Sequence, residues 1–521
     1  MRFDSIYRKG LMILFILASL HTVGQQPVTP DKLYGQLFTD VQLSGIFPDA
    51  KTFADCIPKR DPKEIVADYM KVKNNPAIRF SLQMFVEENF DMPPAPAVLN
   101  YVMQEKNLSN HVRNLWSVLE KPADTVAKGS SLIALPHAYI VSGGRFREMN
   151  YRDAYFIMLG LKETGRADLM DSIVRNCAWL IKKYGYIPEG NRSYYLGRSQ
   201  PPFFAFMVQL LAEVKGEQVL KTYLSALKKE YDFWMDKTGI TKHRVTMPDG
   251  SVLNRYYDRF ANTRPEAYSK DKSLTDQLSA AQSETMNRHI RAAAEAGWSM
   301  SNRWMTDPAD MKSIQTISIV PIDLNCLLYE LEMLIARAEK KYGSMAVSTR
   351  FSLLAAKRKK AIVKYCWNKQ LGFFCDYNIS KKKIQPNITA AGMFPLFTRI
   401  CTQDQADTLS ATAMAKLVKP GGLVNTEVTG LQQNDAPNGW AYLQWITVIG
   451  ARNYGLPDLA VAVGKSWIEL NEKWYETSGK LFDRYNVMNI EKEPVTGEYP
   501  AQEGFGPTNG VYLALKAMFN R

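Results

Sequence analysis

The sequence predicts an all-α protein, because helical periodicity recurs along most of the chain and convincing strand patterns are almost absent. More than a dozen segments carry apolar residues at helical spacing, and the connections between them are short. Residues 371–377 alone have the composition of a strand and are expected to form one arm of a hairpin. No fixed period is visible, which argues against a solenoid repeat. The chain has 521 residues, 46% of them hydrophobic, enough for one large core.

The first 24 residues predict an export signal. Arg2, Arg8 and Lys9 precede an apolar run at 11–20, and a small residue follows it. This order is typical of a secretory signal that is too short to remain as a membrane anchor, although a buried core helix is the alternative. We therefore expect a mature protein that begins near Gln25, is periplasmic or secreted, and has no membrane segment after the signal is removed.

The predicted helices follow in order from residue 62. Asp61-Pro62-Lys63-Glu64 forms a capping box with Pro at the first helical position, so a helix is expected from there to about residue 73. In residues 167–184 the apolar residues form one stripe, and Gly185 ends the helix. The same periodicity predicts helices at 82–90, 98–120, 150–163, 202–215, 217–236, 275–295, 321–342, 349–367, 388–400, 404–418, 438–453, 457–475 and 509–519.

Charge and cysteine usage exclude some classes of function. The net charge of +13 comes from scattered basic residues rather than from one patch, so a nucleic-acid partner is not expected. The six cysteines form no C-x-x-C pair and lie near no histidine, which argues against a zinc site. Cys366 and Cys375 flank an expected turn, and a disulfide and two buried thiols both remain open for them.

Six loop motifs combine arginine, carboxylate, amide and aromatic residues, the groups that a sugar pocket needs. They occupy residues 142–156, 191–204, 264–266, 292–304, 433–444 and 483–510. In the fourth, A-A-A-E-A-G-W-S-M-S-N-R-W, an Ala-rich helix ends at Gly297, and Trp298, Arg303 and Trp304 follow. Indole rings beside a guanidinium suit a sugar, and a tryptophan-rich helix end packed in the core is the alternative.

Together these motifs resemble the trehalase family of glycoside hydrolases from Leu37 to the C-terminus. The specific matches are G-G-R-F-x-E, N-R-S-Y-Y-L-x-R-S-Q-P-P, R-P-E, I-V-P-I-D-L-N, D-x-P-x-G-W and G-E-Y-P-x-Q-x-G-F-G-x-T-N-G. The resemblance implies one (α/α)6 toroid domain over residues 27–521. Its pocket would hold α,α-trehalose and cleave it to glucose with inversion, without a metal or a cofactor. The implied partner is this small sugar, and a monomer is expected.

The resemblance also assigns candidate site residues by position. The candidates for substrate binding are Arg145, Phe146, Arg152, Asp153, Asn191, Arg198, Arg264, Glu266, Gly297, Trp298, Trp440 and Glu498. From their places between helices we expect Arg145, Arg198 and Arg264 to converge on one pocket.

The catalytic positions depart from the family. The general acid of the family is an aspartate, and Ser299 stands in its place; a hydroxyl does not titrate in the working range and cannot replace a carboxylic acid. The general base is a glutamate, and Asp483 stands in its place with its carboxylate one methylene further back. Glu295, one helical turn before Ser299, is the nearest carboxyl that could stand in, with a structural role as the alternative.

Three tryptophans of the family signatures are also replaced, by Arg152, Asn434 and Pro507. Three functions remain open: a trehalase-like hydrolase, a sugar-binding protein without turnover, and an enzyme for a phosphorylated or carboxylated sugar. The third depends on Arg152, whose cation suits an anionic group. An ion pair between Arg152 and Glu148, at i,i+4 on one helix face, is the alternative for that residue.

Overall fold

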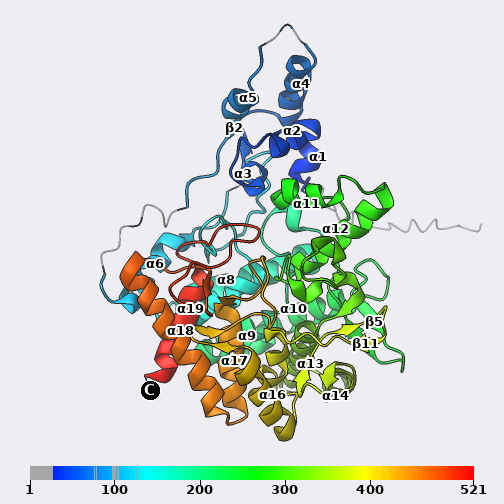
Figure 1. The fold of residues 1–521 in the computed structure, drawn as a ribbon, viewed down its shortest axis with the longest axis vertical. Coiled ribbons are helices and arrows are strands. Elements are labelled where there is room, and N and C mark those ends of the chain that lie inside the picture. Colours follow the sequence, from blue (N-terminus) through cyan, green and yellow to red (C-terminus); the bar gives the residue numbers. More distant parts are fainter. Residues whose placement is uncertain are drawn as a thin grey trace, which may run out of the picture.

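The computed structural model describes residues 27–520 except 76, 78, 97–100, 102–104 and 126. The predicted signal segment, residues 1–24, lies outside the described residues. Within them the helices form two layers around a common axis (Figure 1). The predicted all-α toroid is therefore confirmed.

The inner layer is a closed ring. Its six members among the described residues are α7 (Tyr151–Glu163), α9 (Phe204–Lys215), α13 (Ile322–Tyr342), α15 (Phe394–Phe397), α17 (Ala441–Asn453) and α19 (Gly506–Phe519). Each helix packs against the next, and α19 packs against α7. The outer layer covers them, so that α7 is buried at every position from Tyr151 to Leu161.

Five of the six outer helices in the described part of the chain pack one face on the inner ring, whereas the sixth, formed by residues 403–416, packs mainly on short strands. The six are α6 (Leu108–Leu119), α8 (Ala167–Tyr184), α10 (Gln218–Trp234), α14 (Met345–Cys366), α16 (Gln403–Lys416) and α18 (Pro457–Ser478). In α8 the stripe predicted from the sequence is buried, and both predicted ends are confirmed. The helix predicted at 98–120 is wrong in its first half: α6 begins at Leu108, and the described residues before it, 101 and 105–107, are not helical.

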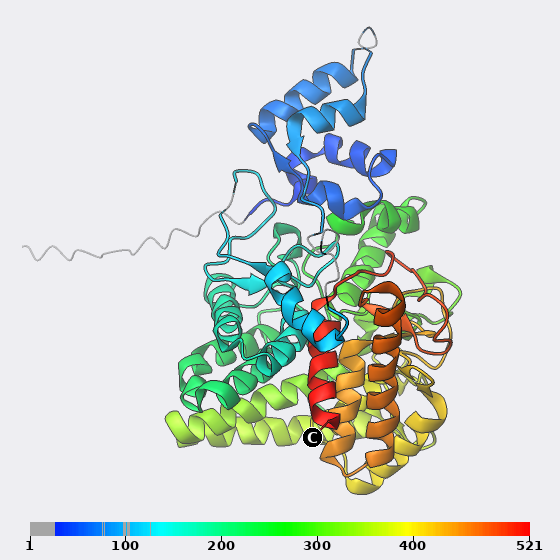
Figure 2. The same ribbon diagram turned by 90° about the vertical axis from the view of Figure 1, so that its left-hand side faces the viewer.

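Two glycines allow the ring to close. A Cβ atom at Gly160 of α7 would lie 2.6 Å from Cα of Gly510 in α19, and one at Gly510 would lie 2.0 Å from the carbonyl oxygen of Phe156. The two helix backbones therefore meet directly, and any side chain at these positions would separate them. Figure 2 shows α19, in red, beside the orange helices that precede it in the chain and against the cyan helix near residue 110.

The N-terminal helices project beyond the ring (Figures 1 and 2). They are α1 (Pro30–Tyr34), α2 (Gln36–Ser44), α3 (Ala50–Asp55), α4 (Pro62–Lys73) and α5 (Leu82–Asn89). Their own apolar cluster includes Phe38 and Phe53, together with Tyr194 and Tyr195 from a loop of the toroid. Two further helices, α11 (Tyr268–Thr275) and α12 (Ala280–Glu295), lie between this cluster and the ring.

The strands of the described residues are short pairs in the connections. They are β1 (Ile57–Pro58), β2 (Phe90–Asp91), β3 (Glu120–Lys121), β4 (Tyr139–Ile140), β5 (Arg244–Thr246), β6 (Val252–Asn254), β7 (Ile319–Val320), β8 (Trp367–Asn368), β9 (Phe373–Phe374), β10 (Tyr377–Asn378), β11 (Lys383–Ile384), β12 (Val418–Lys419), β13 (Gly422–Leu423), β14 (Asn438–Trp440) and β15 (Arg484–Asn486). The strand predicted at 371–377 is β9, paired with β8 in a hairpin, and β10 begins at its end. Cys366 and Cys375 flank this hairpin as free, buried thiols, and no disulfide joins them.

The helix predicted at 388–400 is also wrong in extent. Residues 388–400 form a 3₁₀ turn, Ala390–Met393, followed by the four-residue α15. Gly392 packs so closely on the β9 hairpin that a Cβ would lie 2.2 Å from Cε1 of Phe373. Pro395, which lacks a backbone donor, stands at the start of α15. These two residues restrict the segment to short turns despite its apolar content.

Candidate active site

The loops at the N-terminal ends of the inner helices surround one open cavity, with about 700 Å³ of space between its atoms when the solvent at its mouth is included. Eleven of the residues singled out from the sequence line it: Arg145, Phe146, Arg152, Asp153, Arg198, Arg264, Glu266, Gly297, Ser299, Trp440 and Glu498. The prediction that the three arginines of separate motifs share one pocket is confirmed. The toroid explains this, because the loops before consecutive inner helices meet at one end of the axis.

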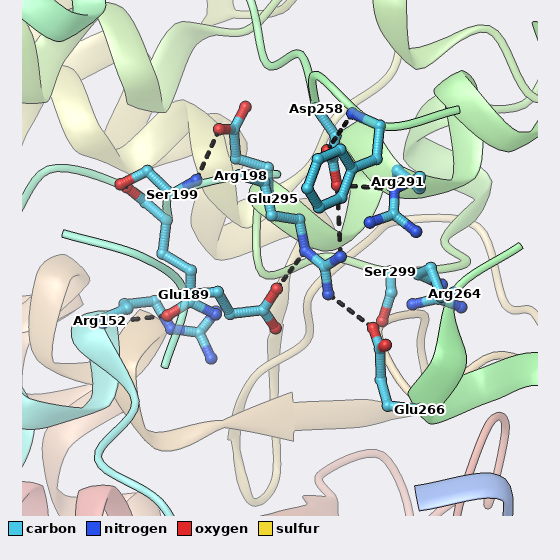
Figure 3. A network of polar contacts seen from close by, with 12 residues as sticks. Arg152, Glu189, Arg198, Ser199, Asp258, Arg264, Glu266, Arg291, Glu295 and Ser299 are labelled. Atoms are coloured by element: carbon cyan, nitrogen blue, oxygen red, sulfur yellow. Dashed lines mark hydrogen bonds and ion pairs between the residues drawn. The ribbon is translucent and has the colours of Figure 1, made fainter. Parts of the chain in front are cut away.

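Arg198 is the centre of the first wall. Its guanidinium lies between Glu189 on one side and Glu266 on the other, as Figure 3 shows. Nη2 donates to Oε1 of Glu266 at 2.7 Å, and Nη1 lies 3.4 Å from Oδ2 of Asp258. Burial raises the pKa of Glu189 to about 7, although Arg198 opposes this. For Glu266 burial acts in the same direction, but Arg198 and Arg264 outweigh it and lower the pKa.

Arg264 organises a second group of polar side chains. It makes two hydrogen bonds to Asp271, at 2.7 and 2.8 Å, and Nη2 donates to Oε1 of Glu498 at 2.9 Å. Oε2 of Glu498 accepts hydrogen bonds from Ser299 Oγ at 3.1 Å and from Gln433 at 3.3 Å. Burial raises the pKa of Glu498, but the charges of Arg264 and Arg145 outweigh it and leave the pKa lowered. Glu498 is therefore an ionised carboxylate beside the position of the missing acid.

A glycine pair positions Arg145. Gly143 and Gly144 have φ of +106° and +57°, and a Cβ at Gly144 would lie 2.4 Å from Oε1 of Gln502. This close approach lets the backbone nitrogen of Arg145 donate to Gln502 at 2.7 Å. The Arg145 guanidinium lies 5.2 Å from the ring centre of Tyr499, which also lines the cavity. The Gly-Gly pair thus sets the backbone that brings Arg145 to the cavity.

Arg152 lines the cavity and is already neutralised by neighbours. Nη1 donates to the carbonyl oxygen of Gly297 at 3.0 Å, and Nη2 lies 3.2 Å from Asp153. The guanidinium lies 4.3 Å from the ring centre of Tyr442. The alternative pairing with Glu148 is wrong, because Glu148 bonds to another cation, Lys51, at 2.9 Å.

Three candidates lie in the framework behind the cavity and do not line it. Trp298 is buried with Arg303, whose guanidinium lies 4.8 Å from the Trp298 ring centre, so the tryptophan-rich helix end is packed in the core. Asn191 bonds to the backbone of Met149 at 2.8 Å and fixes the loop before α7. Glu295 accepts from the backbone nitrogens of residues 199 and 257, at 2.9 and 2.6 Å, and is fully buried.

Asp483, at the position of the family base, is also buried and does not line the cavity. Both its oxygens hold partners: Arg484 Nη1 at 2.7 Å and the backbone nitrogen of Gln502 at 3.1 Å. Burial raises its pKa to about 6, although Arg484 opposes this. A carboxyl with this pKa can exchange a proton near neutral pH, but in this conformation it has no surface on the cavity.

Glu189 is a cavity residue that the sequence did not single out. It stands two residues before the second motif, directly after Ile187 and Pro188. Nothing in the neighbouring sequence distinguishes it from an ordinary glutamate in a loop. Its side chain is 14% exposed, the largest fraction among the four carboxylates that line the cavity. Only the convergence of loops in space identifies it.

Nothing in the described part of the chain suggests a metal centre, since no group of three His, Cys, Asp or Glu residues is arranged to hold an ion. The described helices also include none with the length and apolar content of a membrane span.

The comparisons with known proteins agree with this geometry. The profile of the trehalase family matches residues 45–520. Periplasmic trehalases of Salmonella paratyphi A and Salmonella schwarzengrund are 44% identical to the chain over 498 residues, which cover 94% of it and 87% of each relative. The neutral trehalase of Saccharomyces cerevisiae has a similar structure, with a TM-score of 0.63, 25% identity and 80% of both chains covered.

A more distant similarity concerns the fold alone. A mannosylglycerate hydrolase from Thermus thermophilus has a TM-score of 0.51 at 15% identity, with 80% of this chain and all of that chain covered. The match of a family profile to nearly the whole chain, and the identity to curated relatives over 94% of it, leave one conclusion. The chain belongs to the trehalase family.

Proposed function

We propose that the chain is an exported glycoside hydrolase that cleaves α,α-trehalose, or a related glucoside, with inversion to glucose. The observation that carries the proposal is the convergence of Arg145, Arg198 and Arg264, with their carboxylates, on one cavity. Paired guanidinium and carboxylate groups present donors and acceptors in fixed directions, which suits a ring of sugar hydroxyls. The names of the relatives agree with both the substrate and the predicted export to the periplasm.

The cavity also offers rings for the apolar faces of a sugar. Phe146, Trp440 and Tyr499 line it, and the Phe146 and Tyr499 rings meet edge to face at 5.5 Å between their centres. Trp440 Nε1 donates to the backbone oxygen of Gln433 at 2.9 Å, which fixes the indole. These rings complement the charged walls, because a pyranose has CH faces as well as hydroxyl edges.

Asp483 is the proposed base. An inverting enzyme holds its two carboxyl groups roughly 6.5–9.5 Å apart, with the attacking water between them. To reach that water, Asp483 has to exchange its bond to the Gln502 backbone, so access to the base depends on the segment at residues 497–504. We infer that this segment opens and closes during turnover.

A specific observation favours a second function, sugar binding without turnover. Ser299 carries no carboxyl, and Asp483 does not line the cavity, so neither catalytic position presents an acid or a base to a bound sugar. The polar walls would then bind a glucoside and release it unchanged.

Glucose release from trehalose separates the two functions. Purified protein that releases glucose, at a rate abolished by Asp483→Asn, is a hydrolase with the proposed base. Calorimetric binding of trehalose without glucose release would identify the binding protein and contradict the proposal. Light scattering tests the monomer, which remains a prediction.

A further inference from the structure

We propose that Glu189 is the proton donor of this pocket and takes over the role of the carboxyl that position 299 lacks. This assignment rests on the proposed hydrolase function. It identifies a catalytic residue in a loop before α9 that none of the sequence motifs contains.

The bonding of its two oxygens distinguishes Glu189 from two of its neighbours. Oε2 accepts a hydrogen bond from Nε of Arg198, whereas no hydrogen bond from the described residues reaches Oε1. In Glu498 both oxygens accept hydrogen bonds. In Glu266 one oxygen is bound by Arg198, and the other is buried and has no hydrogen-bond partner among the described residues. An acid needs one oxygen that is held in place and one that can carry a proton to the substrate, and Glu189 has both.

Asp153 is the other lining carboxylate with a free oxygen. Its Oδ1 lies 3.4 Å from Nε and 3.2 Å from Nη2 of Arg152, so one guanidinium faces this carboxylate alone. The Arg198 guanidinium, in contrast, is shared by Glu189, Glu266 and Asp258. Asp153 is therefore compensated as an anion, whereas Glu189 receives only part of one positive charge.

The charge balance around Arg198 indicates a bound proton. Three carboxyl groups, Glu189, Asp258 and Glu266, are joined by hydrogen bonds or ion pairs to two guanidinium groups, Arg198 and Arg291. Carboxylates that outnumber their counterions in a buried network share protons instead of ionising together. Burial raises the pKa of Glu189 to about 7, whereas the pKa values of Glu266 and Glu498 are lowered. Of these three, Glu189 is the one that holds a proton near neutral pH.

The chemical step then balances. The proton on Glu189 passes to the glycosidic oxygen while the bond from C1 to that oxygen breaks, and the bonding pair stays with the departing sugar. Water adds to C1 from the opposite face, and its proton goes to the base, for which Asp483 is proposed. Glu189 is left as a carboxylate paired with Arg198 and takes its next proton from solvent through the cavity.

The test compares two substrates in the full-length mature protein. Trehalose needs protonation of its leaving group, whereas α-glucosyl fluoride does not. We expect Glu189→Gln to lower kcat/KM for trehalose by about 10²–10⁴, the usual contribution of a general acid, and to change fluoride turnover less than about tenfold. The decline of trehalose turnover above neutral pH should also disappear in the variant.

Two control variants separate this role from general damage. Asp153→Asn removes the other lining carboxylate with a free oxygen and is expected to lower the turnover of both substrates by the same factor. Glu230→Gln removes a buried carboxyl that does not line the cavity and should leave the ratio of the two substrates unchanged. Thermal melting verifies that each variant is folded, and glutamine at 189 keeps an oxygen for Arg198.

The outcomes are distinct. If Glu189→Gln lowers the turnover of both substrates by the same factor, or of neither, the assignment of the proton donor is overturned while the hydrolase function stands. A ratio that falls in Asp153→Asn instead assigns the proton to Asp153 and also overturns it. If the wild-type protein turns over neither substrate, the proposed function fails and the assignment fails with it.

Discussion

Restoring the missing carboxyl with Ser299→Asp should create a second proton donor. Ser299 Oγ lies 3.1 Å from Oε2 of Glu498, so a carboxyl at this position would have an oxygen within about 4 Å of an existing carboxylate. Two unit charges at about 4 Å repel by roughly 4 kcal/mol at an effective dielectric constant near 20. Arg264, 2.9 Å from Glu498, cancels part of this repulsion and keeps Glu498 ionised. The proton shared by the pair should therefore reside on the introduced group.

The expected gain depends on Glu189. In the Glu189→Gln background, where the proposed donor is absent, Ser299→Asp should restore part of the ~10²–10⁴ that an acid contributes to trehalose hydrolysis. In the wild-type background the gain should be smaller, because a donor is already present. The full factor is not expected in either background, since the base, Asp483, is buried and bonded to Gln502.

The assay is again a ratio, trehalose turnover over α-glucosyl fluoride turnover, measured for both backgrounds with and without Ser299→Asp. Fluoride turnover reports the base and the binding groups, so a general change in the pocket cancels. An unchanged ratio in the Glu189→Gln background, with folded protein that still binds trehalose, would refute the view that position 299 faces the glycosidic oxygen.

Three further predictions concern stability and binding. Gly160→Ala should lower the free energy of unfolding by about 1–3 kcal/mol, and with it the thermal midpoint, because the new Cβ would lie 2.6 Å from Gly510 Cα. An unchanged midpoint in calorimetry would contradict direct contact between the two backbones. Gly297→Ala should destabilise the fold and weaken the binding of trehalose, as measured by calorimetry. The reasons are that Gly297 has φ +68° and that a Cβ there would lie 2.2 Å from Nη1 of Arg152. Burial raises the pKa of Glu230 from 4.5 to about 8, so the folded state binds this proton more tightly than the unfolded state. The stability that comes from this bound proton is lost as the pH rises toward 8. Thermal melting should therefore show that the wild type loses more stability between pH 5 and pH 8 than Glu230→Gln does. Equal losses of stability in the two proteins would exclude this linkage.

The helices of the toroid were predictable because each outer helix carries its own period. The stripe of α8 needs only one neighbour to be buried, so spacing alone fixed its bounds at 167 and 184. The first three helices, α1 to α3, escaped prediction, since they have five, nine and six residues and obtain their burial from a tertiary cluster. A segment of one or two turns carries too few positions for a period.

The site was predictable only in part, for a different reason. Arg145, Arg198 and Arg264 were identified correctly as cavity residues, whereas Arg303 of the fourth motif is buried in the core. A polar residue in such a motif serves either the ligand or the loop. Asn191 and Glu295 serve the loops, through bonds to backbone nitrogens that no sequence pattern reports. Glu189 faces the cavity although its neighbourhood in sequence is undistinguished. Which side of a loop a carboxyl faces is decided by contacts between distant segments.

The closure of the inner ring by α19 against α7 has a consequence for how the chain reaches its native state. The contacting residues Gly160 and Gly510 are 350 positions apart in a sequence of 521 residues, so their contact cannot form until α19 has been synthesised. A protein that crosses a membrane through a narrow channel must stay unfolded until the crossing is complete. A ring that closes only when α19 packs against α7 is suited to that requirement. Deleting α19 should therefore yield protein that is exported and then degraded, rather than a smaller stable fold.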